Sequence, residues 1–242
     1  AVIVSSLMGA EVSLSQLATG LPKLGSILDR MFPPDLARLE PVFRRLVETF
    51  QMALAGTVIG TVSSVPLAVL ATAKHSPHPV VYVLARALVS LFRTVPDLIW
   101  ALLFVIAVGL GPFAGTLAIV VDTIGFSAKF FAEAMEEADE GPQEALRALG
   151  AGPLGIVACA VLPETLPSMI NTTLFALEKA VRSSVVLGLV GAGGIGIELK
   201  VAMDMFQYDQ AATIIILIFL LVLAVERASG LARGRIIRGQ QP

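Results

Sequence analysis

Three ionisable residues, Glu178, Lys179 and Arg182, lie within one apolar stretch of this 242-residue chain. Charged side chains are costly at membrane depth and usually face an oppositely charged partner or a water-filled path. Glu178 and Arg182 are four residues apart, so they can pair along one face of a helix. Lys179 and Ser183 share a neighbouring face, with Thr172 two turns back on the same side as Lys179. Two hypotheses therefore stand beside each other: a structural ion pair, or a polar face that lines a path.

The apolar stretch before these residues raises the same question. Lys129 and Glu133 are four residues apart, and we interpret them as a structural pair along one helix. The role of Asp122 stays open.

Three of the four glycines in a short segment satisfy the dinucleotide-binding spacing G-x-G-x-x-G, and the fourth stands at a free position of that motif. A true fingerprint opens a strand-helix-strand unit with an acidic residue on the next strand. Here an apolar helical stretch precedes the glycines and another follows them, so we reject nucleotide binding. Small residues instead permit close packing or an irregular backbone, which a membrane tolerates only where protein or water surrounds it. The residues are Gly191, Gly193, Gly194 and Gly196.

Other chemistries lack the residues that they need. His75 and His78 have no nearby Cys or carboxylate, so we expect solvated loop residues and no metal site. The single cysteine, Cys159, can form no internal disulfide, and we expect no structural or redox role for it. The net charge of -2 and the absence of a basic face give no indication of nucleic-acid binding. We expect no catalytic residue, and without a G-x-x-x-x-G-K-[ST] loop any ATP chemistry belongs to a partner.

The composition indicates that lipid surrounds most of this chain. Its residues are 56% hydrophobic and 15% charged, with a mean hydropathy of +0.84, whereas a soluble domain carries about 25% charged residues. Residues 49–73, 98–121 and 211–225 lack Asp, Glu, Lys and Arg and are candidates to cross an apolar layer about 30 Å thick. We therefore predict an all-α integral membrane protein, because backbone groups in lipid must be satisfied within the segment.

Basic residues set the expected orientation. Four arginines follow the final apolar run with one carboxylate among them, which by the positive-inside rule places the C-terminus in the cytoplasm. These residues are Arg227, Arg233, Arg235 and Arg238, with Glu226. Counting backward gives five helices, at 209–228, 164–188, 112–138, 80–108 and 42–73, plus the stub of a partial N-terminal one at 1–10. This topology places five basic residues on the external side of the membrane, against the positive-inside rule: Lys23, Arg30, Arg38, Arg44 and Arg45.

The connecting segments divide between the two sides. In this topology 74–79 and 139–163 are cytoplasmic, whereas 20–41, 109–112 and 189–208 are external. Apolar residues at helical spacing within 20–41 predict one short interfacial amphipathic helix; they are Leu24, Ile27, Leu28 and Met31. The chain thus divides into an N-terminal stub and external loop, 1–41, and a transmembrane domain, 42–238.

The polar segment 141–150 lies between two apolar spans and has the features of a short helix. Pro142 suits the first helical position, and Gly150 can close the helix in a left-handed conformation. A second start signal at 152–153 and a proline stop at 162–163 predict another short helix. We expect a helix-turn-helix knuckle that faces the cytoplasm.

This knuckle resembles the EAA signature of ABC importer permeases, which reads Glu-Ala-Ala, three residues, Gly, nine residues, Ile-x-Leu-Pro. Leu146 replaces the second Ala, and Ala160 replaces the Ile. The resemblance implies a type I ABC importer transmembrane domain with a cytoplasmic coupling helix, which docks on an ATPase subunit dimer and transmits its closure. That partner would carry the ATP and Mg. The positions that match at the right spacing are Glu144, Ala145, Gly150, Leu162 and Pro163.

Segments 93–97, 128–134 and above all 181–196 are similar to the phosphonate transport branch of this family. The branch implies import of a phosphonate, a phosphite or a related oxyanion, delivered by a periplasmic or lipid-anchored binding protein. Methionine permeases share these features in looser form, so another small solute is an alternative. For an anionic substrate, Arg182, Lys179 and Ser183 would line the path. The glycines at 191–196 would form an external gate near the docking surface for the binding protein.

The expectation is a permease subunit without enzymatic activity, which passes several times through the bacterial cytoplasmic (inner) membrane. One such subunit encloses half a pathway, so we expect it to form a dimer with a second permease subunit. We expect the two subunits to be identical. The competing class is an ATPase-independent channel or secondary transporter, which copurification with a nucleotide-binding subunit would distinguish. A membrane-bound NAD-dependent enzyme is a third class, distinguished by nucleotide binding to the isolated chain.

Overall fold

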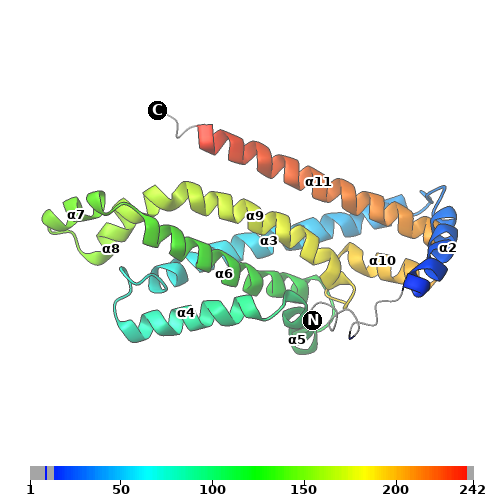
Figure 1. Ribbon diagram of the computed structural model, residues 1–242, viewed down its shortest axis with the longest axis horizontal. Coiled ribbons are helices and arrows are strands. Elements are labelled where there is room, and N and C mark those ends of the chain that lie inside the picture. The colour runs from blue at the N-terminus through cyan, green and yellow to red at the C-terminus, as the bar shows by residue number, and fades with distance from the viewer. Residues whose placement is uncertain (1–8, 10–13, 239–242) are drawn as a thin grey trace.

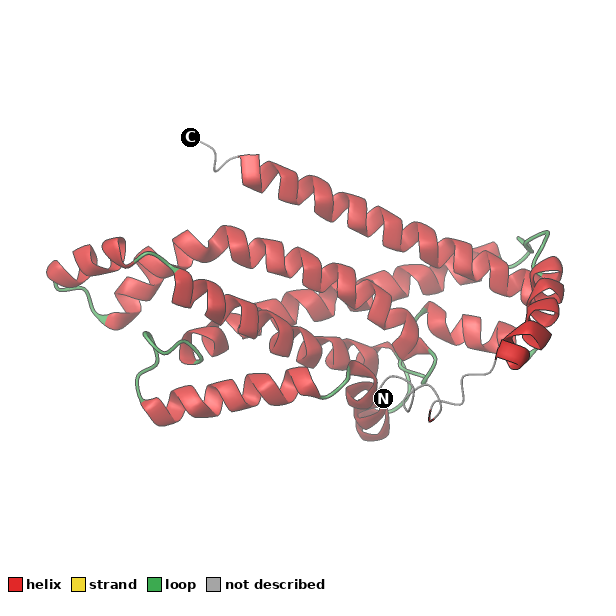
Figure 2. Ribbon diagram, viewed as in Figure 1, coloured by secondary structure: helices red, strands yellow, loops and turns green. Residues whose placement is uncertain are grey.

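The computed structural model describes residues 9 and 14–238, and the regular elements in that part of the chain are all helices. Figure 1 shows long helices side by side in an elongated bundle, with shorter helices at both ends. Figure 2 likewise shows no strand among the described residues. The all-α prediction is confirmed. The predicted stub at 1–10 lies outside the described residues, apart from Gly9.

Short connections join the helices. The helices, in chain order, are α2 (Leu14–Arg30), α3 (Leu39–Leu70), α4 (Pro79–Thr94), α5 (Asp97–Val108), α6 (Pro112–Glu137), α7 (Glu140–Ala148), α8 (Pro153–Ile156), a π-helical stretch (Val157–Val161), α9 (Leu162–Gly188), α10 (Ile195–Asp204) and α11 (Tyr208–Arg238). Within residues 14–238, four helical runs are long and apolar enough to cross a membrane, and the bent pair of α4 and α5 supplies a fifth if it counts as one span. The expected five spans are therefore present when α4 and α5 are counted together as one span. The amphipathic helix predicted within 20–41 is present as α2, although it begins at Leu14.

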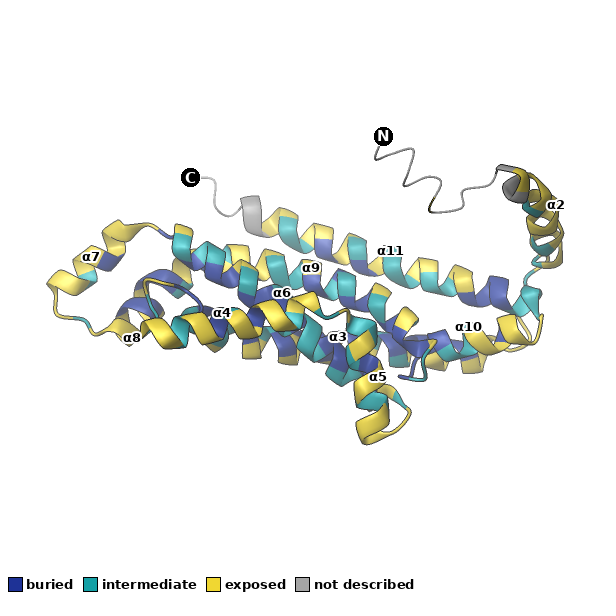
Figure 3. Cartoon of the chain, turned by 60° about the horizontal axis from the view of Figure 1, so that its bottom comes forward, coloured by how far each residue is buried: buried dark blue, intermediate teal, exposed yellow. Residues whose placement is uncertain are grey.

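The prediction of one helix over 80–108 is wrong. The chain forms α4 and α5, whose axes meet at 91° around Val95 and Pro96. Proline has no N–H for the helix ladder and pushes the preceding residue toward extended backbone, and Val95 has φ −78° and ψ 120°. Figure 3 shows α5 projecting from the side of the bundle. Gly109 and Gly111, both at positive φ, then form the expected hairpin into α6.

The predicted helix stop at Leu162-Pro163 is also wrong. The chain from Pro153 to Gly188 is one continuous helical run. A proline removes one backbone N–H, and its ring clashes with the carbonyl one turn earlier. The π-helical stretch Val157–Val161 lies directly before this proline, and a π-turn is one of the ways in which a helix adjusts to such a break. Pro163 is therefore the second residue of α9 and does not end a helix.

α6 lies at the centre of the bundle and packs on α3, α9, α5 and α4. Its most extensive contact is with α3, where small residues let the helices come close together. A Cβ added to Gly56 would lie 2.5 Å from Cγ2 of Ile119, and one added to Gly60 would lie 2.6 Å from Cβ of Thr123. Larger side chains at these two glycines would push the helices apart.

The outer faces of the spans are apolar and exposed. Val58, Ile59 and Val62 of α3 and Ile216 and Phe219 of α11 are between 43% and 67% exposed. Figure 3 shows such exposed residues along the outside of the bundle. Many of the buried core positions are alanines. Lipid tails are as apolar as leucine, so this arrangement is the one expected in a bilayer.

Candidate coupling segment, external turn and intramembrane charges

α7 is a nine-residue helix at one end of the bundle (Figure 1). It begins at Glu140, two residues before the predicted start at Pro142. The reason is that Oδ1 of Asp139 accepts a hydrogen bond from the N–H of Gly141 at 3.1 Å and so caps the helix. Gln143 is fully buried and donates from Nε2 to the carbonyl of Asp139 at 2.9 Å. An acidic residue just before a helix is a known start signal, and it could have revealed Asp139 in the sequence.

The turn after α7 has the conformation that the sequence predicts. Gly150 has φ +81°, in the left-handed region, and the N–H of Ala151 donates to the carbonyl of Leu146 at 3.0 Å. Leu149 and Leu154, on either side of this turn, are 83% and 82% exposed. The two leucines give this polar segment an exposed apolar surface.

The EAA-like residues divide into an exposed half and an anchored half. Glu144, Ala145 and Gly150 are exposed on the knuckle. Leu162 packs against the buried cluster that contains Phe131, while Pro163 lies exposed at the start of α9. The knuckle thus connects directly to the core of the spans.

Two side-chain contacts that the sequence reasoning missed hold the knuckle to the bundle. Oε1 of Glu164 in α9 accepts a hydrogen bond from the N–H of Asp139 at 2.7 Å. Nζ of Lys74, in the turn between α3 and α4, lies 2.5 Å from Oε1 of Glu140. These contacts tie α7 to the start of α9 and to the turn between α3 and α4.

His75 is not the solvated loop residue that the sequence predicts. It is half-buried, and its Nε2 is buried without a hydrogen-bond partner. Burial, followed by the charges of Arg147 and Lys74, lowers the pKa of His75. His78 is exposed, and its Nδ1 accepts a hydrogen bond from the N–H of Val80 at 3.1 Å, which caps α4.

The glycine-rich turn between α9 and α10 lies at the opposite end of the bundle from α7 (Figure 1). Gly191, Gly193 and Gly194 all have positive φ. A Cβ on Gly193 would lie 2.6 Å from Cα of Pro112, at the start of α6, and one on Gly196 would lie 2.0 Å from the carbonyl oxygen of Val185. Three of the glycines therefore form an irregular turn, and Gly196 packs closely against α9 at the start of α10.

Two polar residues of α3 bind this turn. Oε1 of Glu48 accepts a hydrogen bond from the N–H of Gly194 at 2.9 Å, and Oγ1 of Thr49 accepts one from the N–H of Ile195 at 2.7 Å. The turn is thus held between α3 and the start of α6.

The charges of α9 pair with neighbouring helices. Arg182 lies 2.5 Å from Glu226 of α11, and Glu178 lies 2.8 Å from Arg233 of α11. The predicted pairing of Glu178 with Arg182 is therefore wrong, because α11 packs on α9 and brings a closer partner to each. The predicted pair Lys129 with Glu133 is confirmed at 2.5 Å.

The structure does not bring all three predicted path residues to one surface. Nζ of Lys179 lies 2.7 Å from Oδ1 of Asp122 on α6 and 5.4 Å from the ring centre of Phe126, whereas Arg182 contacts α11. Ser183 is half-buried one turn after Lys179 on α9. Asp122, whose role the sequence left open, is the partner of Lys179.

Comparison with known proteins decides the family. The family described as binding-protein-dependent transport system inner membrane component matches residues 64–236. The chain belongs to this family. The permease is 42% identical over 217 residues to the phosphate-import permease protein PhnE of Mycolicibacterium smegmatis, a match that covers 89% of this chain and 41% of that one. It is 40% identical to the phosphite transport system permease protein PtxC of Stutzerimonas stutzeri, over 90% of this chain and 79% of that one.

The fold of the permease matches a solved ABC transporter. It superimposes on a chain of the MetNI methionine ABC transporter, in an inward-facing conformation, with a TM-score of 0.72 and 27% identity, covering 84% of the permease and 99% of that chain. The predicted type I ABC importer fold is confirmed, as is the resemblance to the phosphonate branch. The permease is thus an inner-membrane subunit of an ABC importer.

Proposed function

We propose that this permease serves an ATP-driven importer of a phosphorus oxyanion, such as a phosphonate, phosphite or phosphate. The substrate class rests on sequence identity to two relatives. Over about nine-tenths of its length, this chain is 42% identical to a permease named for phosphate and 40% identical to one named for phosphite. The permease spans 41% of the length of the phosphate-import relative. Import of another small solute such as methionine is the alternative, which the fold match to MetNI favours.

The coupling surface in this proposal is the knuckle from Glu144 to Pro163. ATP and Mg²⁺ bind an ATPase dimer, which receives the exposed Leu149 and Leu154 in its docking surface. Its closure displaces α7, and the contacts of Asp139 with α9 pass the displacement to the spans. The C-terminus of α11 lies at the same end of the bundle as α7 (Figure 1), which supports a cytoplasmic C-terminus.

The opposite end receives the substrate in this proposal. A binding protein docks beside α2, α10 and the glycine turn, whose glycines at 191, 193, 194 and 196 act as the external gate. Two permease subunits enclose the path, and Lys179, Arg182 and Ser183 stay the proposed path residues of α9. The ion pairs of Lys179 and Arg182 must then exchange with the passing anion.

Reconstitution tests the proposal. The permease, its ATPase and its binding protein are placed in vesicles, and uptake of phosphite, phosphate, methylphosphonate and methionine is measured with ATP and without it. ATP-dependent uptake of an oxyanion is the expected result. Uptake of methionine alone refutes the substrate class, and oxyanion uptake that needs no ATPase places the protein among channels or secondary transporters.

A second experiment tests the docking surface. Leu149→Asp with Leu154→Asp is expected to abolish copurification with the ATPase. Leu36→Asp is the matched control, because Leu36 is 64% exposed between α2 and α3, at the other end of the bundle. Equal recovery of the ATPase with all variants would remove the knuckle from this role.

A further inference from the structure

A cavity of about 660 Å³ opens between α4 and α6. Its polar lining comes from Arg86, Ser90, Arg93 and Thr94 of α4 and from Lys129 of α6. Among the described residues, the lining contains three cations, two hydroxyls and no carboxylate. Pockets for small ligands have volumes of about 300–1,000 Å³ and a few convergent polar groups. The cavity has the size and the charge of a site for a small anion.

The polar residues lie on one face of α4. Arg86, Ser90 and Arg93 follow one another at spacings of four and three residues, which places them on one side of the helix. The exposed Leu84 and Leu88 lie on the other side. A cation in a membrane span faces the bundle interior, a partner or water, and not lipid tails. The polar face of α4 is therefore directed toward the cavity beside α6 and away from lipid.

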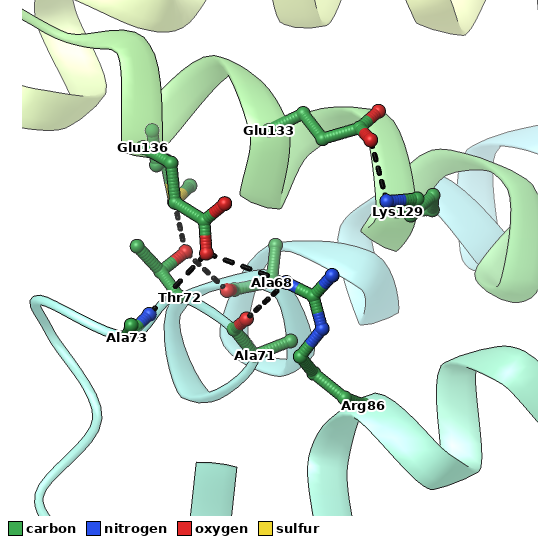
Figure 4. A network of polar contacts seen from close by, with 9 residues as sticks. Ala68, Ala71, Thr72, Ala73, Arg86, Lys129, Glu133 and Glu136 are labelled. Atoms are coloured by element: carbon green, nitrogen blue, oxygen red, sulfur yellow. Dashed lines mark hydrogen bonds and ion pairs between the residues drawn. The ribbon is translucent and has the colours of Figure 1, made fainter. Parts of the chain in front are cut away.

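Arg93 supplies a charge that the bundle does not neutralise. Nη1 of Arg86 lies 3.3 Å from Oε1 of Glu136, and Nζ of Lys129 lies 2.5 Å from Oε1 of Glu133, as Figure 4 shows. Arg93 is exposed and has no ion-pair partner among the described residues. Three cations against two carboxylates leave a surplus of one positive charge at the pocket.

α6 fixes the position of Arg93. A Cβ added to Gly125 would lie 2.8 Å from the backbone N of Arg93 and 2.8 Å from the carbonyl carbon of Phe92. The two helices thus touch backbone to backbone at this point, which only small residues permit. The helix ends directly afterward, because Pro96 breaks it. The contact with α6 therefore fixes the backbone that carries the Arg93 side chain at the end of α4.

We propose that this pocket binds the transported phosphorus oxyanion and that Arg93 contacts it. A guanidinium binds phosphate-type oxygens through two parallel hydrogen bonds, and the hydroxyls of Ser90 and Thr94 can donate to the remaining oxygens. The inference rests on the proposed function, because it takes the cargo to be an oxyanion. A lipid phosphate presents the same chemistry, so the test separates the two sources.

The single tryptophan reports on this pocket. The ring of Trp100 in α5 lies 5.9 Å, centroid to centroid, from that of Phe92, the neighbour of Arg93. The complex of permease and ATPase is placed in nanodiscs of phosphatidylcholine and titrated with phosphite and with phosphate while fluorescence is recorded. The Trp100→Phe complex supplies the background from the other subunits. A saturable change in the wild type is the expected result.

Three variants identify the contact. Arg93→Gln is expected to raise the half-saturating concentration about tenfold or more, and Arg93→Lys to raise it less. Arg227→Gln is the matched control, because it removes an exposed arginine of α11 and is expected to bind as the wild type does. Copurification with the ATPase shows that each variant is folded. Equal binding by wild type and Arg93→Gln, or no saturable binding by the wild type, overturns the inference.

Two further measurements distinguish a transported oxyanion from a lipid phosphate in the pocket, and failure of this inference from failure of the proposed function. A fluorescence change caused by phosphatidylglycerol in the nanodisc, and not reversed by phosphite, assigns the pocket to lipid headgroups and overturns the inference. Oxyanion uptake that is equal in wild type and Arg93→Gln removes the site but leaves the proposed function intact. Failure of the wild type itself to take up any oxyanion refutes the proposed function, and the inference falls with it.

Discussion

Arg182 of α9 donates a hydrogen bond from Nη1 to Oε1 of Glu226 in α11 at 2.5 Å. One turn away on α9, Glu178 lies 2.8 Å from Arg233 of the same helix, α11. The two pairs have opposite polarity, since α9 supplies the cation in one and the carboxylate in the other. A displacement of α11 along α9 would break both, so the pairs fix the register of these helices.

The pair of Arg182 and Glu226 is expected to couple energetically. Arg182→Glu should lower the thermal midpoint of the purified complex, because it places two carboxylates together. Adding Glu226→Arg should restore it, with a coupling energy of about 0.5–3 kcal/mol in the double-mutant cycle. Additive effects of the two changes would contradict the pairing. Restored stability without restored oxyanion uptake would indicate that Arg182 also lines the path.

Gly125→Ala is expected to destabilise the permease by about 1–3 kcal/mol, because the new methyl group would overpack the contact of α6 with α4. The methyl would lie 2.8 Å from the backbone of Phe92 and Arg93. Thermal unfolding of the purified complex measures the loss. Gly25→Ala in α2 is the control, since nothing lies within 4 Å of its added Cβ. A loss of the same size at Gly25 would mean that packing against α4 is not the cause.

Gly150→Val is expected to uncouple ATP hydrolysis from uptake. Its φ of +81° is strained for any residue with a Cβ, and holding a β-branched residue there costs roughly 1–3 kcal/mol. The turn after α7 would therefore change conformation, and the surface that carries Leu149 would change with it. ATPase activity and uptake are measured in the same vesicles. Gly155→Ala, whose Cβ meets only an ordinary contact at 3.9 Å, should leave both unchanged, and unaltered coupling in Gly150→Val would exclude this role.

Thr49→Val is expected to cost about 1–3 kcal/mol of stability, because the buried N–H of Ile195 loses its acceptor. Thr49 is fully buried, and its Oγ1 lies 2.7 Å from that nitrogen. Thr116→Val serves as the control, since Thr116 bonds only to the carbonyl of Pro112 in its own helix. Thermal unfolding and hydrogen exchange of 191–196 report the change. Unaltered exchange in that turn would show that Thr49 does not hold it.

The knuckle is expected to loosen as the pH falls. The pKa of His75 is lowered by its burial and by Arg147 and Lys74, so the unfolded segment takes up a proton at higher pH than the folded one. The stability from neutral His75 is complete above its ordinary pKa of about 6.5 and is lost as the pH falls below that value. The opening of 71–78 and α7, measured by hydrogen exchange corrected for the intrinsic exchange rate at each pH, should therefore increase as the pH falls below about 6.5. His75→Gln should remove that increase, and a persistent increase in the variant would assign it to another group.

The sequence determined the features that depend on neighbours along the chain. Apolar runs without charges identified the spans, because crossing lipid requires about 20 consecutive apolar residues. Gly150 and the polar segment around Glu144 identified the knuckle, because helix ends are set by residues within one turn. Even these local signals failed at Pro96 and Pro163. The first divides a span that the sequence reasoning took as one helix, whereas the second is absorbed by a π-helical stretch and stops nothing.

Only the tertiary structure decided which charges meet. Glu178 had a suitable partner one turn away in Arg182, yet each pairs with α11, which packs on α9 from more than forty residues away in sequence. In the same way, Arg93 became part of a basic pocket only because α4 lies on α6 beside Lys129. Local composition specifies where a helix forms, but the partners of its polar face depend on which helices pack together, and that is a long-range property of the whole bundle.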